Sequence, residues 1–343
     1  MTSNNPNPGP EVAFKLAANA KETEGLSLGK IVWGRFVRHK AAMVSAVVLA
    51  VTIVVVLSSI GVGPIPGWWR WGPTDIDPTI VNGGRPTMAW DGLFPTFGEH
   101  PFGQDQIGRD VFARTMQGAQ VSLLVMFLMG IIATAVGVAI GAFSGFYRGR
   151  TDFTLQRVTE VFIAIPTIVV TAVIGHKYGA DNPALFGIVL GLLLWPGLAR
   201  LVRAEYLSLR EREFVDAARV AGASDRAVMF KHILPNAIGV VIVNATLLMA
   251  TATILEAALS FLGFGIQPPN VSLGQLINEY QTSFSTRPWL FWWPGIFIII
   301  FALTINLIGD GLRDAFDPRQ RRVPKTREMN KKAVTKAETE VAQ

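Results

Sequence analysis

The chain has 343 residues, of which 50% are hydrophobic and 16% are charged, with a mean hydropathy of +0.38. Soluble domains carry about 25% charged residues, so this composition excludes an ordinary soluble domain and indicates a protein that crosses a membrane several times. The absence of cysteine excludes disulfides, thiolate metal ligands and a cysteine nucleophile. The formal net charge of +6 fits a membrane surface or nucleic acid, and only the distribution of the charges can decide between them.

The N-terminal part precedes the first apolar run, which begins near Ala41, and this position argues against a secretory signal. Residues 1–25 are rich in Asn, Pro, Gly, Ala and Glu, and we expect a disordered tail there. Residues 26–40 place apolar side chains, including Ile31 and Phe36, near one helical face between basic residues. This pattern predicts an interfacial helix, and an ordinary basic flank of the first span is the alternative.

Apolar runs that could cross a membrane occur at 41–62, 119–146, 161–175, 183–199, 233–255 and 288–308. About 17–25 helical residues cross the hydrocarbon core. The third run is short and contains Pro166, and the fourth contains Trp195–Pro196, so we expect kinks in both. We therefore predict an all-α, polytopic membrane protein with six transmembrane helices. A loop at 63–118 follows the first span, the remaining spans lie within 119–317, and a charged tail covers 318–343.

Lysine and arginine are distributed unevenly between the connections. Residues 1–40, 144–157, 199–236 and 310–343 hold 25 of the 31 Lys and Arg residues. Because basic connections stay on the cytoplasmic side, both termini and the 199–236 connection are predicted to be cytoplasmic. This distribution is the one expected for a protein oriented in a lipid bilayer, so it accounts for the basic net charge and gives no support to nucleic acid as a partner.

The 205–235 connection has a more regular pattern than a simple loop requires. Its stretch DAARVAGASDRAVMFKHILPN covers residues 216–236. Helix formers precede Gly222, which fits the left-handed position that ends a helix. Ser224 fits the N-cap of a second short helix over 225–233, after which Pro235 opens the fifth span. The pattern predicts a helical hairpin on the membrane surface.

Three interpretations of this hairpin compete. It could be a solvated loop whose charges only hold the topology, or a DNA-binding helix-turn-helix, or a docking element for a cytoplasmic partner. Both of its ends are fixed to the bilayer and its second helix is short, which argues against base readout. An ordered, capped hairpin is more than topology requires, and this favours docking.

The hairpin resembles the cytoplasmic signature loop of ABC importer permeases, with the pattern E-A-A-x3-G-x9-I-x-L-P. Two positions depart from it, since Asp216 replaces the leading Glu and His232 occupies the Ile position. The resemblance implies that the short helix of the hairpin sits in a cleft of a cytoplasmic ATPase subunit. The coupling residues that it implies are Asp216, Ala217, Ala218, Gly222, Ala223, Ser224, Asp225, His232, Leu234 and Pro235.

Three further stretches are similar to the dipeptide, oligopeptide and nickel group of these permeases, and specifically to its C-type subunit. They cover residues 100–123, 259–277 and 294–319. The resemblance implies a type I ABC importer permease fold in a bacterial cytoplasmic membrane. It also implies a homologous permease, two ABC ATPase subunits and an extracytoplasmic solute-binding protein as partners. Peptides are the expected cargo, and nickel or another small solute is the alternative.

Several isolated features suggest packing or transport roles. Gly137, Gly141 and Gly145 recur every four residues and predict a strip where another helix approaches closely, within the chain or across subunits. Glu256 is an acid within an apolar stretch, so it is either a structural group or part of the substrate path, where it could meet a peptide's amino group. Asn244 is expected to form an interhelical hydrogen bond, with a substrate-path role as the alternative.

Arg109 and Asp110 follow Gly108 at an expected loop-to-helix junction. They predict either a capped helix start or a contact with the partner permease or the receptor.

Other motifs for catalysis or cofactor binding are missing from the sequence. It has no G-x4-G-K-[ST] phosphate loop, so ATP and Mg²⁺ are expected on partner subunits and no cofactor or catalytic residue on this chain. No His has a ligand-like neighbour at i+3 or i+4, which leaves a metal site unsupported. An ion-driven secondary transporter and a membrane scaffold that transports nothing remain open as alternative functions.

Overall fold

The structure is a computed structural model that describes residues 28–90, 95–178 and 182–317. Its helices are α2 (Leu28–Arg38), α3 (Lys40–Ser59), α4 (Val111–Tyr147), α5 (Gly149–Ala164), α6 (Thr167–Tyr178), α7 (Pro183–Leu194), α8 (Pro196–Leu209), α9 (Glu213–Val220), α10 (Asp225–Ala227), α11 (Leu234–Phe261), α12 (Leu273–Tyr280) and α13 (Trp289–Phe316). The tails predicted at 1–25 and 318–343 lie outside the described residues.

Short strands and a 3₁₀ turn lie in the connection between α3 and α4, and two further short helical turns lie later in the chain. Strands β1 (Gly61–Val62) and β2 (Ile65–Pro66) form one antiparallel hairpin, and β3 (Ala89–Trp90) and β4 (Pro95–Thr96) form another. The remaining segments are the 3₁₀ turns η1 (Val81–Gly84) and η3 (Gln281–Ser283) and the π-helical η2 (Val228–Ile233).

Among the described residues, four helices are long and apolar enough to cross a membrane: α3, α4, the continuous helix from Asp225 to Phe261, and α13. The number rises to six if each of two bent pairs makes one crossing. The pair α5–α6 bends by 70° and the pair α7–α8 by 46°. Pro166 and Pro196 lie at these bends, as the sequence predicts, because proline lacks the amide hydrogen that continues a helix.

The ends of several spans differ from the sequence prediction. Helix α4 begins at Val111, eight residues before the predicted start, because the Asp110 carboxylate accepts a hydrogen bond from the Ala113 amide and caps the helix there. The predicted third span, 161–175, straddles the bend between α5 and α6. Helix α11 extends to Phe261 and α13 to Phe316, past their predicted ends at 255 and 308, because the helical backbone continues through the polar residues that end each apolar run.

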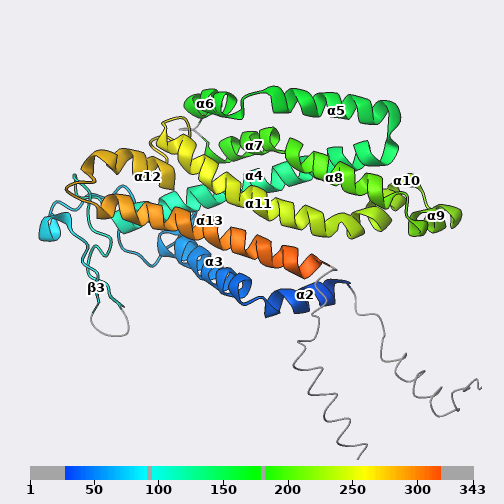
Figure 1. Cartoon of the computed structure of the whole chain (residues 1–343). Coiled ribbons are helices and arrows are strands. Elements are labelled where there is room, and N and C mark those ends of the chain that lie inside the picture. Colours follow the sequence, from blue (N-terminus) through cyan, green and yellow to red (C-terminus); the bar gives the residue numbers. More distant parts are fainter. Residues whose placement is uncertain (1–27, 91–94, 179–181, 318–343) are drawn as a thin grey trace, which may run out of the picture.

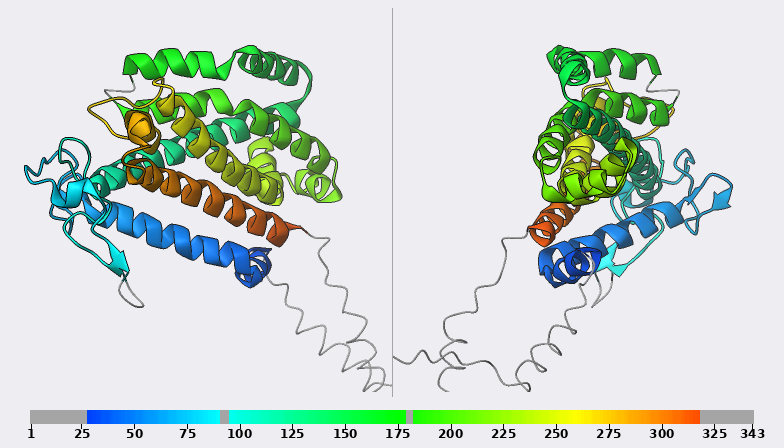
Figure 2. Two further views of the ribbon diagram at one scale, coloured as in Figure 1. Left: turned by 60° about the vertical axis from the view of Figure 1, so that its left-hand side comes forward. Right: turned by 90° about the vertical axis from the view of Figure 1, so that its right-hand side faces the viewer.

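The long helices lie side by side, with α9 and α10 at one end of the bundle and α12 and β3 at the opposite end (Figure 1). Helices α5 and α6 lie along one edge of the bundle, next to the layer of α4, α7, α8 and α11, and the views in Figure 2 agree. Helix α2 packs on the C-terminal end of α13, where Arg35 donates to the carbonyl oxygens of Ala315 and Asp317. Helix α2 thus covers residues 28–38 of the helix predicted over 26–40, and its position at the membrane interface stays a prediction.

The glycine strip of α4 is the place where α8 approaches most closely. A Cβ atom added at Gly141 would lie 2.5 Å from the Ala199 carbonyl oxygen, and one added at Gly145 would lie 2.7 Å from that of Arg203. At Gly137 the corresponding distance, to the Trp195 carbonyl oxygen, is 3.1 Å. The strip thus meets successive turns at the start of α8 and along it. The structure places this contact within the chain.

Candidate functional site

The predicted hairpin forms a closed glycine turn between α9 and α10. Gly222 has φ 84°, which is the left-handed conformation that the sequence predicts. The Gly222 amide donates to the Arg219 carbonyl at 2.9 Å, and the Ala223 amide donates to the Ala218 carbonyl at 3.0 Å. This pair of bonds is a Schellman motif, which satisfies carbonyls at the end of α9. The turn is therefore a fixed geometry.

The second half of the hairpin is continuous with a long helix. Ser224 is the N-cap of α10, as predicted, and its hydroxyl accepts a hydrogen bond from the Ala227 amide at 3.4 Å. The prediction of a separate short helix over 225–233 is wrong, because α10 passes through the π-helical turn η2 directly into α11. At about 1.5 Å per residue, the helix from Asp225 to Phe261 reaches the far end of the bundle as one rod.

The underside of the hairpin is anchored in an apolar cluster. Val215 of α9 is buried in it with Met229 and Ile233 of η2, against residues of α4 and α8. The Tyr206 hydroxyl of α8 donates to the Met229 carbonyl at 3.1 Å in a buried position. A displacement of the hairpin must therefore displace α8 and α11.

Charged side chains add ties between the hairpin and the corner of α4 and α5. Arg148, which has φ 57°, pairs with Glu211 at 3.2 Å. Arg203 of α8 holds the Asp152 carboxylate of α5 with two nitrogens, each at 2.7 Å. This two-point geometry fixes both distance and direction between α5 and α8.

The outer face of the hairpin is open. The Asp216 side chain is 71% exposed, and Val220, at the end of α9, is 91% exposed. Of the other coupling residues that the resemblance implies, Ala217, Gly222, Ser224, Asp225 and Pro235 are exposed, whereas Ala218, Ala223, His232 and Leu234 are half-buried. The structure brings these residues together on one projecting element.

At the opposite end, a buried histidine organises the loop between α3 and α4. His100 Nδ1 lies 2.7 Å from Asp110 Oδ2, and its Nε2 lies 3.2 Å from Asp77 Oδ2. The Trp69 indole donates to the second oxygen of Asp110 at 3.1 Å. Asp110 is buried, so of the two roles open in the sequence the structure shows the capped helix start.

Replacing His100 with leucine is expected to destabilise the chain strongly. The change leaves the buried Asp110 carboxylate without its ring partner, and breaking a buried pair from one side costs about 3–5 kcal/mol. Thermal unfolding in detergent measures the effect. Arg70→Ala is the control, because the Arg70–Glu99 pair is about half exposed and such pairs contribute about 0–1 kcal/mol. Equal unfolding temperatures for the two variants would contradict the structural role of His100.

A second charged cluster lies beside this loop and joins it to α12. Glu279 accepts from Arg109 Nη2 at 2.6 Å and from Arg114 Nη2 at 2.8 Å, and both arginines also bind Asp105. Burial raises the pKa of Glu279, but Arg114 and the hydrogen bonds from Gln275, Arg114 and Arg109 outweigh it and hold the pKa below its usual value. The ion pairs therefore persist at neutral pH and weaken only as the pH falls through that lowered value.

The sequence could not identify most of this cluster. Arg109 stood out only as part of a helix start. Arg114, Gln275 and Glu279 gave no signal, because Arg114 lies 165 positions before Glu279 in the chain. Charged residues near polar connections are common in any sequence. Only the contact between α4 and α12 in the structure shows that Arg114 and Glu279 belong to one cluster. Among the described residues, no group of three or more His, Asp or Glu side chains could hold a metal ion.

Glu256 and Asn244 of α11 both form hydrogen bonds within the chain. Glu256 is buried and accepts from the hydroxyls of Ser122 and Ser260, each at 2.8 Å. This geometry fits its structural alternative, while its role in a substrate path stays a prediction. The Asn244 amide donates to the Val240 carbonyl one turn earlier in α11 at 2.8 Å. The hydrogen bond expected between helices is thus formed within α11, because the polar side chain reaches its own backbone.

Comparisons with known proteins agree with one another. Residues 137–322 match the family described as the binding-protein-dependent transport system inner membrane component, and residues 27–81 match the N-terminal TM domain of oligopeptide transport permease C. A protein of Brucella ovis, provisionally named a peptide permease, is 39% identical over 83% of this chain and 89% of its own length. The oligopeptide transport system permease protein OppC of Haemophilus influenzae is 36% identical over 88% of this chain and 91% of its own.

Among solved structures, a chain of the MetNI methionine ABC transporter in an inward-facing conformation has a TM-score of 0.48 and 20% identity, and the match covers 60% of this chain and 97% of that one. This likeness is too distant to support a conclusion. The family match and the relatives above 30% identity carry the assignment. The chain belongs to the family of binding-protein-dependent transport system inner membrane components, as a permease component of an ABC importer.

Proposed function

We propose that this chain is one of two homologous permease subunits that together form the path of a peptide importer in a bacterial cytoplasmic membrane. Relatives at 34–39% identity bear the names of peptide or oligopeptide permeases, which supports peptides as cargo. Two ABC ATPase subunits bind ATP and Mg²⁺ below the membrane, and a solute-binding protein delivers the peptide from outside. Both termini of this chain are cytoplasmic.

The observation that carries the proposal is the continuous connection from the exposed hairpin to the membrane helices. The rigid turn at Gly222 projects Asp216 and Val220 into solvent, and the same element continues through η2 into α11. ATP binding draws the two ATPases together and moves the hairpin that each grips. Because α11 is rigidly joined to the hairpin, and α8 is tied to it through Tyr206, both helices move with it.

Cargo-dependent ATP hydrolysis tests this function. The full-length chain is reconstituted in proteoliposomes with a homologous permease, the ATPase pair and the binding protein. Peptide-loaded binding protein should stimulate ATP hydrolysis and uptake, and the empty binding protein or one offered nickel should not. Uptake that persists without ATP and collapses with the ion gradient would instead establish a secondary transporter. Absence of any cargo-dependent hydrolysis would leave only a scaffold role.

A further inference from the structure

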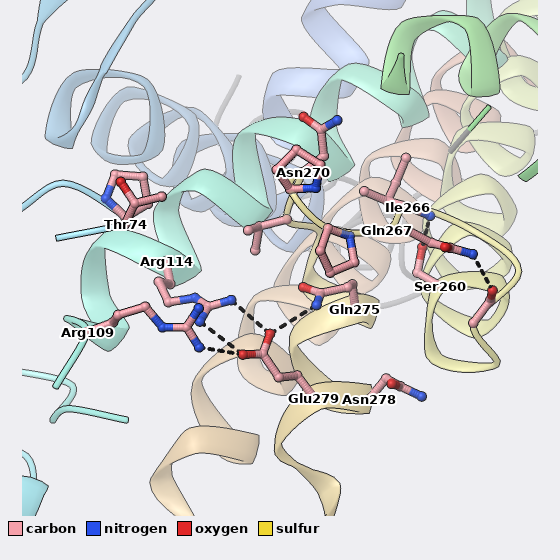
Figure 3. A pocket seen from close by; sticks show the side chains of 15 residues that line it. Thr74, Arg109, Arg114, Ser260, Ile266, Gln267, Asn270, Gln275, Asn278 and Glu279 are labelled. Carbon is pink, nitrogen blue, oxygen red and sulfur yellow. Dashed lines mark hydrogen bonds and ion pairs between the residues drawn. The ribbon is translucent and has the colours of Figure 1, made fainter. Parts of the chain in front are cut away.

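A cavity of about 780 Å³ opens between α12, the loop that follows α11 and the segment before α4. Cavities that bind small molecules usually measure about 300–1,000 Å³. Arg109, Arg114, Gln275 and Glu279 line one side of it, and Ser260 and Ile266 line another (Figure 3). The cavity lies at the end of the bundle opposite the hairpin, where α12 is drawn in Figure 1.

The carboxylate in the wall is already fully engaged. Glu279 accepts from Arg109 Nη2, from both terminal nitrogens of Arg114 and from the Gln275 amide at 3.0 Å. A carboxylate offers about four lone-pair positions. Glu279 therefore has little capacity left to bind a cation, and the cluster favours a ligand that accepts hydrogen bonds.

The charge of the wall points the same way. Among the described residues that line the cavity, the charged ones are Arg109, Arg114 and Glu279, so the wall carries one excess positive charge. Asp105, which balances the second guanidinium, lies behind the wall in a buried position and does not line the cavity. With Asp105 the four charged groups sum to zero. An anion in the cavity nevertheless meets the two guanidinium groups at the wall and lies farther from Asp105, which favours an anion over a cation there.

Two polar atoms of the wall are left without partners. Arg114 Nε and Gln275 Oε1 are buried and have no hydrogen-bond partner among the described residues. Both side chains are more than nine-tenths buried, and both line the cavity. An unpaired buried polar group is costly. After a small movement the Arg114 Nε–H group can donate to a bound carboxylate, whereas Gln275 Oε1 accepts and can pair only with a donor of the bound molecule, such as an amide N–H. Buried unpaired groups are rare in native structures and each needs an explanation, and a bound molecule that completes the hydrogen bonds is one.

We propose that this cavity binds the carboxylate group of a small solute through Arg109 and Arg114, and that the solute is a short peptide held by its C-terminal carboxylate before it enters the path. The carboxylate site is argued from the geometry alone, whereas the peptide identity rests on the proposed function. Arg109, whose side chain is 24% exposed, makes the first contact, and Arg114 closes on the bound group. Ser260 of α11 lines the cavity, so a bound solute contacts the helix that continues into the hairpin.

Protection of a single cysteine tests the site. The chain lacks cysteine, so Thr74→Cys, at an exposed position in the wall, gives one reporter, and Asn278→Cys gives a second. The reconstituted complex, without ATP or binding protein, is treated with a membrane-impermeant maleimide. Trialanine should slow labelling at either position, and trialanine amide, which lacks the carboxylate, should not.

The arginine requirement is tested in the same assay. Arg109→Gln should raise the trialanine concentration for half-protection about 10- to 100-fold, the usual effect of losing one hydrogen bond to a charged group. Arg85→Gln is the matched control, because Arg85 is exposed in the same loop region and does not line the cavity. It should leave protection unchanged.

Several outcomes would overturn the proposal: equal protection by the amide, no protection by trialanine, or failure of both cysteines to react from outside. The comparison of trialanine with its amide needs no change at Arg109, so it remains decisive if Arg109→Gln does not fold. Cargo-dependent ATP hydrolysis of the full importer is measured separately. A complex that hydrolyses ATP in response to loaded binding protein but shows no protection would reject the cavity site and leave the proposed function standing.

Discussion

Gly222→Val is expected to lower peptide uptake strongly while leaving the chain folded in the membrane. A β-branched residue at φ 84° is strained by about 1–3 kcal/mol, and the strain is relieved by opening the turn between α9 and α10. No atom lies within 4 Å of a Cβ at this position, so the effect acts on the backbone and not on packing. When both are measured in proteoliposomes, uptake should fall while basal ATP hydrolysis continues.

Gly222→Asn is the matched control, because asparagine has a side chain of similar size and tolerates the left-handed conformation. Each 1.4 kcal/mol of strain changes the equilibrium constant for closing the turn about tenfold. A strain of about 1–3 kcal/mol therefore predicts that uptake by the valine variant falls about 5- to 150-fold below that of the asparagine variant. Equal uptake by both variants would show that the turn does not transmit the motion.

Gly141→Ala is expected to destabilise the whole bundle. The added methyl group would lie 2.5 Å from the Ala199 carbonyl oxygen and 2.7 Å from Val202 Cβ. Because the first of these is backbone, α4 and α8 must move apart, and overpacking of this kind costs about 1–3 kcal/mol. The thermal unfolding temperature in detergent should fall, and uptake should fall with it, since α8 carries both Tyr206 and Arg203.

Gly197→Ala is the control for this change. Gly197 lies in α8, and an added Cβ there meets no atom within 4 Å. Alanine is favoured over glycine inside a helix by about 0.5–1 kcal/mol, so this variant should unfold at the same temperature as the parent or higher. Equal unfolding temperatures for the two alanine variants would contradict the claim that the glycine strip allows the close approach of α4 and α8.

Much of the helical framework follows from local patterns in the sequence. Apolar runs locate the long helices, and Pro166 and Pro196 locate the bends, because both signals act over a few residues. Gly222 and Ser224 predict the turn and the cap for the same reason. The local shape of the hairpin was therefore predictable, apart from the π-helical turn η2, which changes the hydrogen-bond register without a distinctive residue pattern.

The parts that could not be predicted depend on contacts between distant segments. The partner of the glycine strip is α8, and nothing at Gly141 itself distinguishes an internal contact from one between subunits. The pairing of Arg114 with Glu279 joins residues of α4 and α12 that are 165 positions apart. The true start of α4 depends on Asp110, for which the sequence left a cap and a partner contact open, and the two are separated only once His100 and Trp69 are seen to hold its carboxylate.

Photocrosslinking from the tip of the hairpin tests the central claim most directly. A photoreactive amino acid is placed at position 220, where the native Val220 is 91% exposed. The control is position 74, which lies with residues of α12 in the cavity wall at the opposite end of the bundle. Illumination of the assembled importer should join this chain to an ATPase subunit from position 220 and not from position 74. If position 220 gives no adduct with an ATPase, or reacts with a reagent confined to the outside of the cell, the hairpin does not couple this permease to its motor.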